Sequence, residues 1–349
     1  MPVFPWTETE AQRRLRLERQ QQMRTDAAVI DAAVARACGA PPASKTRVMT
    51  GFSNEVYDVE TVDGQRVIVK LHHPWVSDAP YFGEERWALE QCARFGVPAP
   101  RLLLVDQVPG AAPGGRPLSV LVQSRLPGAP LAALLDSGAL LPHEARPVLA
   151  EAGRALARIH AVETSGFGRL DPSGKGHGAG SSLLDYPLAH LLEAAMGAGF
   201  TAAQRAQVAE AYHLLETHRP LWEQIRQRGI APRWLHGDLS PRHIMVSDRR
   251  LSGLIDFEFP TGGDPAAELG GWDRAYGEIL PAAWLLEGYA TVAPADGTFA
   301  LRMAMHRVRV CFAHLGRENP PPDLLERTRA GIGQDLQILQ HEMQRWSRR

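Results

Sequence analysis

The chain opens with two helical patterns and then changes to short runs of alternating apolar and polar positions. Residues 8–24 are polar on nearly every side, whereas residues 26–37 repeat apolar side chains at helical spacing, so both stretches predict helices. Pro41 and Pro42 end this leader. From Lys45 the alternation predicts strands at 47–52, 55–62, 66–72, 101–105 and 117–125. Asp63-Gly64 between the second and third runs is typical of a hairpin turn.

The strand pattern gives way to a helical one after Leu126–Pro130, where we place a domain hinge. A helix at 81–95 is expected among the strands, and 165–182 is glycine-rich and reads as a surface loop. A strand–turn–strand is expected at 243–257. Further helices are expected near 143–161, 182–197, 201–227, 265–290, 299–316 and 321–346. The pattern predicts an α+β chain with a helical extension, a small β-rich domain and a larger helical domain, at 1–44, 45–126 and 127–349.

Composition excludes several classes of protein. With 349 residues, 44% hydrophobic and 22% charged, the chain as a whole is globular rather than disordered. The net charge of -1 lacks the basic excess of a nucleic-acid-binding protein. Three cysteines without a CxxC pair argue against a disulfide framework and a zinc site. The start has no signal-peptide pattern and no stretch is long enough to span a bilayer, so we expect a soluble, cytoplasmic protein without a membrane partner.

The strongest chemical signal is a pair of aspartates at the two ends of a predicted hairpin. Asp238 lies in HGDLSPRH, and Asp256 ends the second strand in LIDFE. Antiparallel strands joined by a short turn bring their outer ends together, so His243 and both carboxylates converge. Phosphoryl transfer needs a carboxylate that orients the attacking hydroxyl and further ligands for a divalent metal. The alternative is that Asp238 caps a turn and Asp256 merely ends a strand.

These motifs resemble the signature of the aminoglycoside phosphotransferase and choline kinase family, which corresponds to HRD, Asn and DFG in protein kinases. The resemblance implies a bilobal protein-kinase-like fold that binds ATP or GTP with Mg²⁺ and phosphorylates a small-molecule hydroxyl. It makes Asp238 the catalytic residue and Asp256 and His243 the metal ligands. His243 departs from the usual Asn, and in this respect the loop is similar to that of macrolide phosphotransferases. An imidazole ligand suits transition metals, which favours Mn²⁺ alongside Mg²⁺. The alternative is that His243 only hydrogen-bonds the loop.

Lys70 closes the strand VIVK, where the resemblance implies a lysine that contacts the nucleotide phosphates. Only three of the 38 basic residues are lysines, so an ordinary surface charge would more often be arginine in this chain. The compact ammonium fits between phosphate oxygens and an acidic partner better than a guanidinium does. That partner is expected to be Glu85, from its offset to GVP, with Glu84 as the competing choice.

Two further segments resemble nucleotide-binding parts of the family. Ser53 and Asn54 lie in TGFSN, which is similar to the loop that covers the nucleotide. Ser124 and Leu126 lie in VQSRLPG, which resembles the interdomain hinge whose backbone groups would meet adenine. The alternative for the second segment is an edge strand followed by a turn.

The acceptor side is less defined. Asp273 and Glu278 follow the metal motif where the family gathers acceptor-binding side chains, and carboxylates would suit a cationic aminoglycoside; the alternative is a solvated helix face. Asp264 is expected to brace the catalytic loop, and Glu268 departs from the usual second Asp. His236 is expected to be a buried, hydrogen-bonded histidine. Tryptophans at helical spacing are expected in the core rather than in a substrate pocket, namely Trp222, Trp272 and Trp284.

The function expected from the resemblance is an ATP-dependent O-phosphotransferase, with an aminoglycoside-type antibiotic as the leading acceptor because SGFG is similar to a stretch of hygromycin phosphotransferase. A macrolide, favoured by His243, and a metabolic or biosynthetic hydroxyl compound are the alternatives. From another class, a non-catalytic nucleotide-binding protein stays open. A protein kinase is disfavoured because no APE segment follows IDFE. The sequence indicates nothing about the oligomeric state.

Overall fold

The computed structural model describes residues 4–51, 53–74, 82–178, 201–217, 219–220, 231–315 and 322–347. The chain forms two compact units that interleave along the sequence. The first unit contains Met1–Leu141, Asp171–Gly174 and Ser240–Pro260, and the second contains Pro142–Leu170, Lys175–Leu239 and Thr261–Arg349. The expected helix at 182–197 lies outside the described residues, as do residues 221–227 at the end of the expected helix 201–227, which include Trp222.

The N-terminal extension forms both expected helices. Helix α1 (Glu10–Gln22) begins with a capping box in which Thr9 and Gln12 exchange side-chain and backbone hydrogen bonds. Helix α2 (Ala27–Cys38) is capped by the Asp26 carboxylate, which accepts from the Ala28 N–H, and it ends at Gly39 in the left-handed conformation. These local signals explain why a largely polar sequence such as α1 is helical at all.

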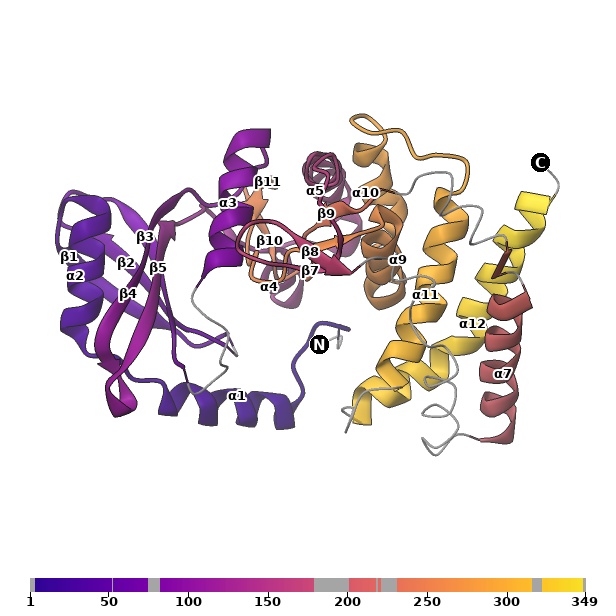
Figure 1. Ribbon diagram of the computed structural model, residues 1–349, viewed down its shortest axis with the longest axis horizontal. Coiled ribbons are helices and arrows are strands. Elements are labelled where there is room, and N and C mark those ends of the chain that lie inside the picture. Colours follow the sequence, from indigo (N-terminus) through magenta and orange to yellow (C-terminus); the bar gives the residue numbers. More distant parts are fainter. Residues whose placement is uncertain are drawn as a thin grey trace. The chain divides into compact units, whose positions relative to one another are not determined.

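A five-stranded antiparallel sheet follows, in the order β1-β2-β3-β5-β4 (Figure 1). The strands are β1 (Pro42–Val48), β2 (Glu55–Thr61), β3 (Arg66–His72), β4 (Leu102–Ala112) and β5 (Arg116–Ser124). The first strand, at 42–48, both starts and ends earlier than the expected 47–52, and β4 and β5 meet through a short 3₁₀ turn (Pro113–Gly115) rather than a long loop. The apolar stripe of α2 packs against one face of this sheet, where Ile30 and Val34 join Val59, Val67 and Val69 in the core.

The rest of the first unit positions a hairpin. Helix α3 (Gly83–Phe95) ends at Gly96, and residues 171–174 pack against it so closely that a Cβ at Gly174 would lie 2.4 Å from the Trp87 indole. Strands β10 (Ile244–Ser247) and β11 (Arg250–Leu254) pair antiparallel, and β6 (Ala129–Pro130) adds a third strand before helix α4 (Leu131–Asp136). Gly128, at φ +85°, permits this pairing because a Cβ there would lie 1.8 Å from the Val246 carbonyl oxygen.

The second unit is mostly helical. Its helices and short 3₁₀ turn are η2 (Pro142–Ala145), α5 (Arg146–Ile159), α7 (Ala202–Thr217), α9 (Pro265–Tyr276), α10 (Ala282–Tyr289), α11 (Phe299–Leu315) and α12 (Pro322–Ser347). A small antiparallel sheet, ordered β8-β7-β12-β9, comprises β7 (Phe167–Leu170), β8 (Gly176–Gly178), β9 (Arg233–Leu235) and β12 (Thr261–Gly263). Close approaches between glycine backbones, such as Gly166 against Gly176, hold these short strands together.

Three expectations need correction. The region 165–182 contains strands β7 and β8 rather than only a surface loop, because its glycines permit close backbone pairing. The expected helix at 265–290 is two helices, since α9 ends before Gly277 and Pro281 precedes α10. The compact units also do not divide at residue 126, because β6 pairs with β10 and returns the hairpin to the first unit.

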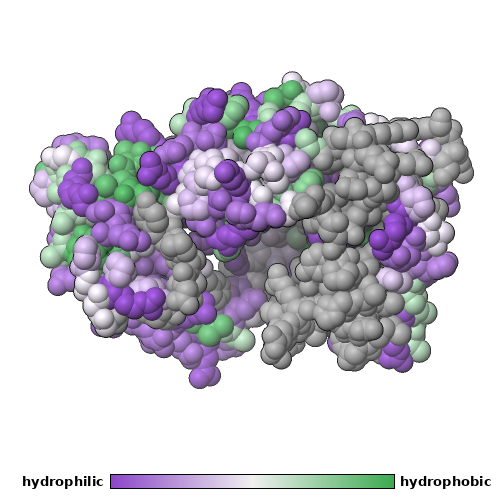
Figure 2. Space-filling model, in the orientation of Figure 1, coloured by the Kyte–Doolittle hydropathy of each residue, from purple (hydrophilic) through white to green (hydrophobic). Residues whose placement is uncertain are grey.

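Apolar side chains are largely internal. On the face drawn in Figure 2, hydrophobic residues form small patches among hydrophilic ones. Among the described residues, the large exposed hydrophobic side chains are scattered along the chain, as Leu15, Val62, Leu141 and Val292 illustrate. Within the same described residues, every helix is too short or too polar to cross a membrane.

Candidate active site

Lys70 is a buried cation of the first unit. It lies on β3, between Val56 of β2 and Leu121 of β5, and only 7% of its surface is exposed. Its Nζ lies 2.7 Å from Glu85 Oε1 and 2.8 Å from Asp256 Oδ1. The strand alternation thus places one ammonium between two carboxylates that are far apart in the sequence.

Glu85, rather than Glu84, is the partner that α3 presents to this lysine. Both lie in the first turn of the helix, but Glu85 is buried whereas Glu84 is partly exposed. A carboxylate in the first turn also interacts favourably with the positive end of the helix dipole. The remaining oxygen of Glu85, Oε2, has no hydrogen-bond partner among the described residues.

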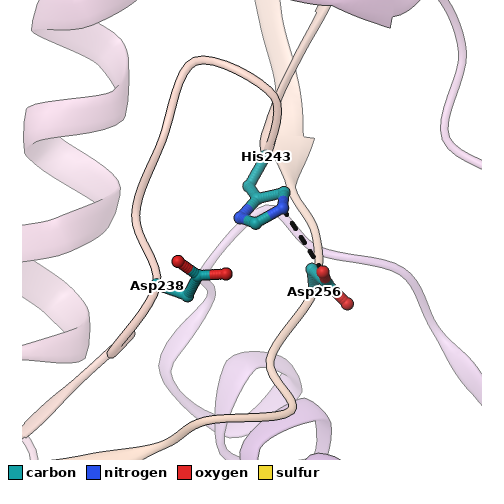
Figure 3. Close-up of side chains that lie close together, drawn as sticks. All are labelled: Asp238, His243 and Asp256. Carbon is teal, nitrogen blue, oxygen red and sulfur yellow. Dashed lines mark ion pairs between the residues drawn. The ribbon is translucent and has the colours of Figure 1, made fainter. Parts of the chain in front are cut away.

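The hairpin β10–β11 brings His243 and Asp256 to one end. His243 precedes β10 and Asp256 follows β11, and the Ile255 N–H donates to the His243 carbonyl oxygen at 3.0 Å. His243 Nε2 lies 3.3 Å from Asp256 Oδ2 (Figure 3). Asp256 has φ +70°, a left-handed conformation that Asp and Asn tolerate better than other residues with side chains. That turn after β11 directs the carboxylate toward both His243 and Lys70.

Negative charge exceeds positive charge around Lys70. Glu258 joins Asp256 and Glu85, and it is held by the Asn54 amide, which donates to Glu258 Oε2 at 3.0 Å. Burial alone would lower the pKa of Lys70, but the neighbouring carboxylates, Asp256 above all, raise it. Burial and the charge of Asp256 raise the pKa of Glu258 to about 7. Three carboxylates around one ammonium form a cluster that favours a further cation.

A candidate metal-binding cluster consists of three side chains from residues 238–256. One ligand atom from each of Asp238, His243 and Asp256 lies within 4.8 Å of the others, with Asp238 exposed and the other two partly buried. Figure 3 shows the three side chains directed toward one another. Two carboxylates and an imidazole form a donor set that suits Mg²⁺ through its oxygens and Mn²⁺ through both ligand types. The residues therefore fit the divalent ion that the resemblance implies.

Glu268 braces the loop that carries Asp238. Its Oε2 accepts from the His236 N–H at 3.0 Å, and its Oε1 accepts from the Gly237 N–H at 2.8 Å. Its Oε2 also lies 2.9 Å from His160 Nε2. Burial opposes ionisation, but the hydrogen bond and charge of His160 lower the pKa of Glu268. His236 is buried as expected, and the Asp238 N–H points to its Nδ1 at 3.4 Å.

Asp264 does not brace this loop, contrary to expectation. Its Oδ1 accepts from the Ala266 N–H at 3.0 Å and caps α9, while Arg302 and His306 of α11 contact its carboxylate. Burial opposes ionisation, yet His306 and Arg302 lower the pKa of Asp264. Burial lowers the pKa of His306 to about 4. Glu268, one turn further along α9, accepts from the backbone of the loop in place of Asp264.

Asn54 contacts the carboxylate cluster, whereas Ser53 precedes β2, Ser124 ends the inner strand β5 and Leu126 follows β5. Asn54 is buried, with its amide on Glu258 and its Oδ1 3.0 Å from His72 Nδ1. Ser53 is partly exposed. The Ser124 N–H donates to the Arg101 carbonyl oxygen at 2.8 Å. The Leu126 carbonyl accepts from Arg125 at 3.4 Å.

The two expected acceptor residues differ in their surroundings. Asp273 Oδ2 is 2.5 Å from Arg307 Nη1, and Arg307 also bonds the buried Asp335. Glu278 is exposed and lies in the turn after α9 rather than on a helix face. Trp272 is buried, as expected for a core residue, and its Nε1 donates to the Leu280 carbonyl at 2.9 Å; Trp284 is partly exposed.

Sequence reasoning gave no role to two residues that the structure places at the site. Glu258 stands in IDFE, two positions after Asp256, and that short spacing is the sequence feature that could have placed it at the site. Glu268 was noticed only as a departure from the usual Asp, although its longer side chain is what reaches the His236 and Gly237 backbone.

The sequence model of the phosphotransferase enzyme family matches residues 46–299, more than half of the chain. The chain belongs to that family. It is therefore a phosphotransferase. No curated protein matches it at a significant level.

Solved structures share the fold of this phosphotransferase at low identity. Aminoglycoside phosphotransferase APH(4)-Ia, in a complex with AMP-PNP and hygromycin B, is 15% identical with a TM-score of 0.57, covering 91% of this chain and 98% of its own. A protein named as a fructosamine-3-kinase from Thermobifida fusca is 19% identical with a TM-score of 0.57, covering 90% and 100%. Macrolide 2′-phosphotransferase from Brachybacterium faecium is 15% identical with a TM-score of 0.51, covering 88% and 97%. These likenesses confirm the bilobal kinase-like fold class.

Proposed function

We propose that this phosphotransferase moves the γ-phosphate of ATP or GTP to a hydroxyl of a small molecule, with an aminoglycoside-type antibiotic as the leading acceptor. The observation that supports it most is the contact of Lys70 Nζ with both Glu85 and Asp256. A fold that brings the buried Lys70 and Glu85 together with the partly buried Asp256 holds an ammonium for phosphate oxygens beside a carboxylate for a metal.

Each residue has a separate task in this proposal. Lys70, held by Glu85, contacts the nucleotide phosphates. Asp238 accepts the proton of the attacking hydroxyl and orients it, which its exposure permits. Asp256 and His243 would hold Mg²⁺ or Mn²⁺, which supplies neutralisation of phosphate charge when bound. Most of the catalysis is then positioning and charge stabilisation by preorganised groups.

The acceptor is argued from two observations. The fold is shared with an enzyme crystallised with hygromycin B, and Glu278 offers an exposed carboxylate for a cationic acceptor, whereas Asp273 is already paired with Arg307. His243 favours a macrolide as the second candidate, because macrolide phosphotransferases resemble this chain at that position. A sugar or other metabolic hydroxyl compound is the third.

The test is a coupled nucleotide-hydrolysis screen with Mg²⁺ or Mn²⁺ across aminoglycosides, macrolides and sugars, with mass spectrometry to show a phosphorylated acceptor. Wild type should give acceptor-dependent turnover and Asp238→Asn should lose at least ~10²-fold of it, as expected for a general base. Asp248→Asn is the matched control, since Asp248 is exposed at the hairpin turn, where its φ of +50° also suits Asn.

The outcomes separate the classes of function. Transfer that survives in Asp238→Asn at more than about a tenth of the wild-type rate would refute the assignment of Asp238. Nucleotide binding with no acceptor turnover in any class would favour a non-catalytic nucleotide-binding protein.

A further inference from the structure

Helix α1 contacts the loop that is expected to cover the nucleotide, residues 49–54 between β1 and β2, of which 49–51, 53 and 54 are described. Gln20 is the buried contact residue of this helix: it is completely buried although it stands in a run of three glutamines. Gln21 and Gln22, the next two residues of the same helix, are exposed. A fully buried glutamine needs hydrogen-bond partners for its amide, so its surroundings are informative.

The Gln20 side chain holds the loop by its backbone. Nε2 donates to the Gly51 carbonyl at 2.7 Å and to the Asn54 carbonyl at 3.0 Å. Oε1 accepts from Arg47 Nη2 at 3.1 Å, which leaves both amide hydrogens for the loop. Arg16, one turn earlier on α1, bonds the Met49 carbonyl. The helix therefore engages the loop near its start, its middle and its end.

The same loop is also held from the side of the metal-binding residues. Asn54 gives its backbone carbonyl to Gln20 and its side-chain amide to Glu258, which lies two positions after Asp256. Its Oδ1 meets His72 at the end of β3, the strand of Lys70. All of these residues belong to the first compact unit. Asn54 is thus fixed between α1 and the carboxylate cluster.

A second contact ties the extension to the catalytic loop. The Trp6 Nε1 donates to Asp136 Oδ1 at 3.0 Å, and the Trp6 carbonyl accepts from Arg242, the residue before His243. The Phe4 ring stacks on Trp6, with centroids 4.7 Å apart. The segment that begins with Trp6 and ends with α1 therefore touches both loops that the proposed chemistry uses in this unit.

We propose that α1 acts as a positioning element for nucleotide binding, with Gln20 as the positioning residue that orders the loop 49–54 before the nucleotide arrives. This inference rests on the proposed function. Gln20 lies outside the region that matches the family, which begins at residue 46. Ordering the loop in advance lowers the entropic cost of binding, so its loss appears as weaker nucleotide affinity.

Three variants of the full chain separate loop ordering from simple packing. Gln20→Ala removes the whole side chain, whereas Gln20→Glu keeps its size and its contact with Arg47 but replaces the amide donor with a second acceptor facing two carbonyls. Gln21→Ala is the matched control, since it makes the same change at an exposed position of the same helix.

The experiment measures AMP-PNP–Mg²⁺ affinity by calorimetry and amide hydrogen exchange of peptides covering 49–54, with thermal unfolding of each variant alongside. We expect Gln20→Ala and Gln20→Glu to weaken affinity by about ten-fold, as the loss of two buried hydrogen bonds implies. Exchange in 49–54 should become faster in both, while Gln21→Ala behaves as wild type.

Two results would overturn the inference and one would overturn the proposed function instead. Wild-type affinity and exchange in Gln20→Glu would show that the two donated hydrogen bonds do not position the loop. Equal losses in Gln20→Glu and Gln21→Ala would show an effect of the helix as a whole. If wild type itself binds no AMP-PNP, the proposed function fails, and the exchange measurement still decides whether Gln20 orders the loop.

Discussion

Glu268→Ala should destabilise the fold far more than the loss of an ordinary glutamate does. Glu268 has a side chain that is 5% exposed and accepts from three donors, namely the His236 N–H, the Gly237 N–H and His160 Nε2. Two buried groups, His160 Nε2 and the His236 N–H, lose their hydrogen-bond partner, at a cost of about 1–3 kcal/mol each. The exposed Gly237 N–H can be hydrated instead. Removal of a buried charge offsets part of the loss, so we expect about 3 kcal/mol.

The assay is equilibrium urea unfolding followed by circular dichroism, with Glu90→Ala as the control. Glu90 is also a helical glutamate in an ion pair, with Arg86 at 2.8 Å, but the side chains of both partners are about half exposed. Such exposed pairs contribute about 0–1 kcal/mol, so the two variants should separate clearly. Turnover of Glu268→Ala should also fall, because the backbone next to Asp238 loses its support.

The pH dependence gives a second check on the same residue. The pKa of Glu268 is lowered in the folded chain, so its stabilisation is complete above the ordinary glutamate pKa of about 4.3. It is lost as the pH falls through the lower folded-state value. The difference in unfolding free energy between wild type and Glu268→Ala should therefore be constant near neutral pH and shrink in acid. A loss in Glu268→Ala no larger than in Glu90→Ala near neutral pH would refute the brace.

Three other substitutions test separate parts of the structure. Lys70→Arg should not support phosphoryl transfer although it keeps the charge, because a planar guanidinium does not fit where the ammonium lies between two carboxylates; near-normal turnover would remove Lys70 from the site. His243→Asn should stay active while its metal titration shifts from Mn²⁺ toward Mg²⁺; titrations identical to wild type would leave His243 a hydrogen-bonding residue only. Gly128→Ala should lower the unfolding free energy by about 2 kcal/mol or more, because the left-handed backbone and the Val246 carbonyl leave no room for a methyl group; an unchanged urea midpoint would contradict that close approach.

Much of the candidate site could be predicted because its geometry is local or repeats along a strand. A two-residue turn at Asp248 and Arg249, both in the left-handed conformation, closes the hairpin that brings His243 and Asp256 together. That inference needed only the period of the pattern and the direction in which strands return. Lys70 was instead identified from the resemblance of VIVK and from the rarity of lysine in this chain, and the structure buries it on β3.

What could not be predicted depends on residues that meet from distant elements. Asp264 and Glu268 are both acids at the start of α9, and Arg302 and His306, on a separate helix, are what engage Asp264 elsewhere. Gln20 gave no signal because it looks like its neighbours in a polar helix, and its burial follows from the packing of α1 on a loop. Side-chain patterns report periodicity, and they carry no information about which of several similar residues meets a distant partner.

The packing of α2 on the sheet shows that the part of the chain that folds as a unit extends beyond the residues that match the family. A fragment trimmed to begin at residue 46, where the family match starts, would lose the apolar stripe that includes Ile30 and Val34 and would expose the valines of β2 and β3 to water. It would also leave the buried Glu55 without the Thr25 hydroxyl, which donates to it at 2.7 Å. Such a fragment should aggregate rather than fold, and any relative without this helix must cover the same sheet face with another segment of its chain.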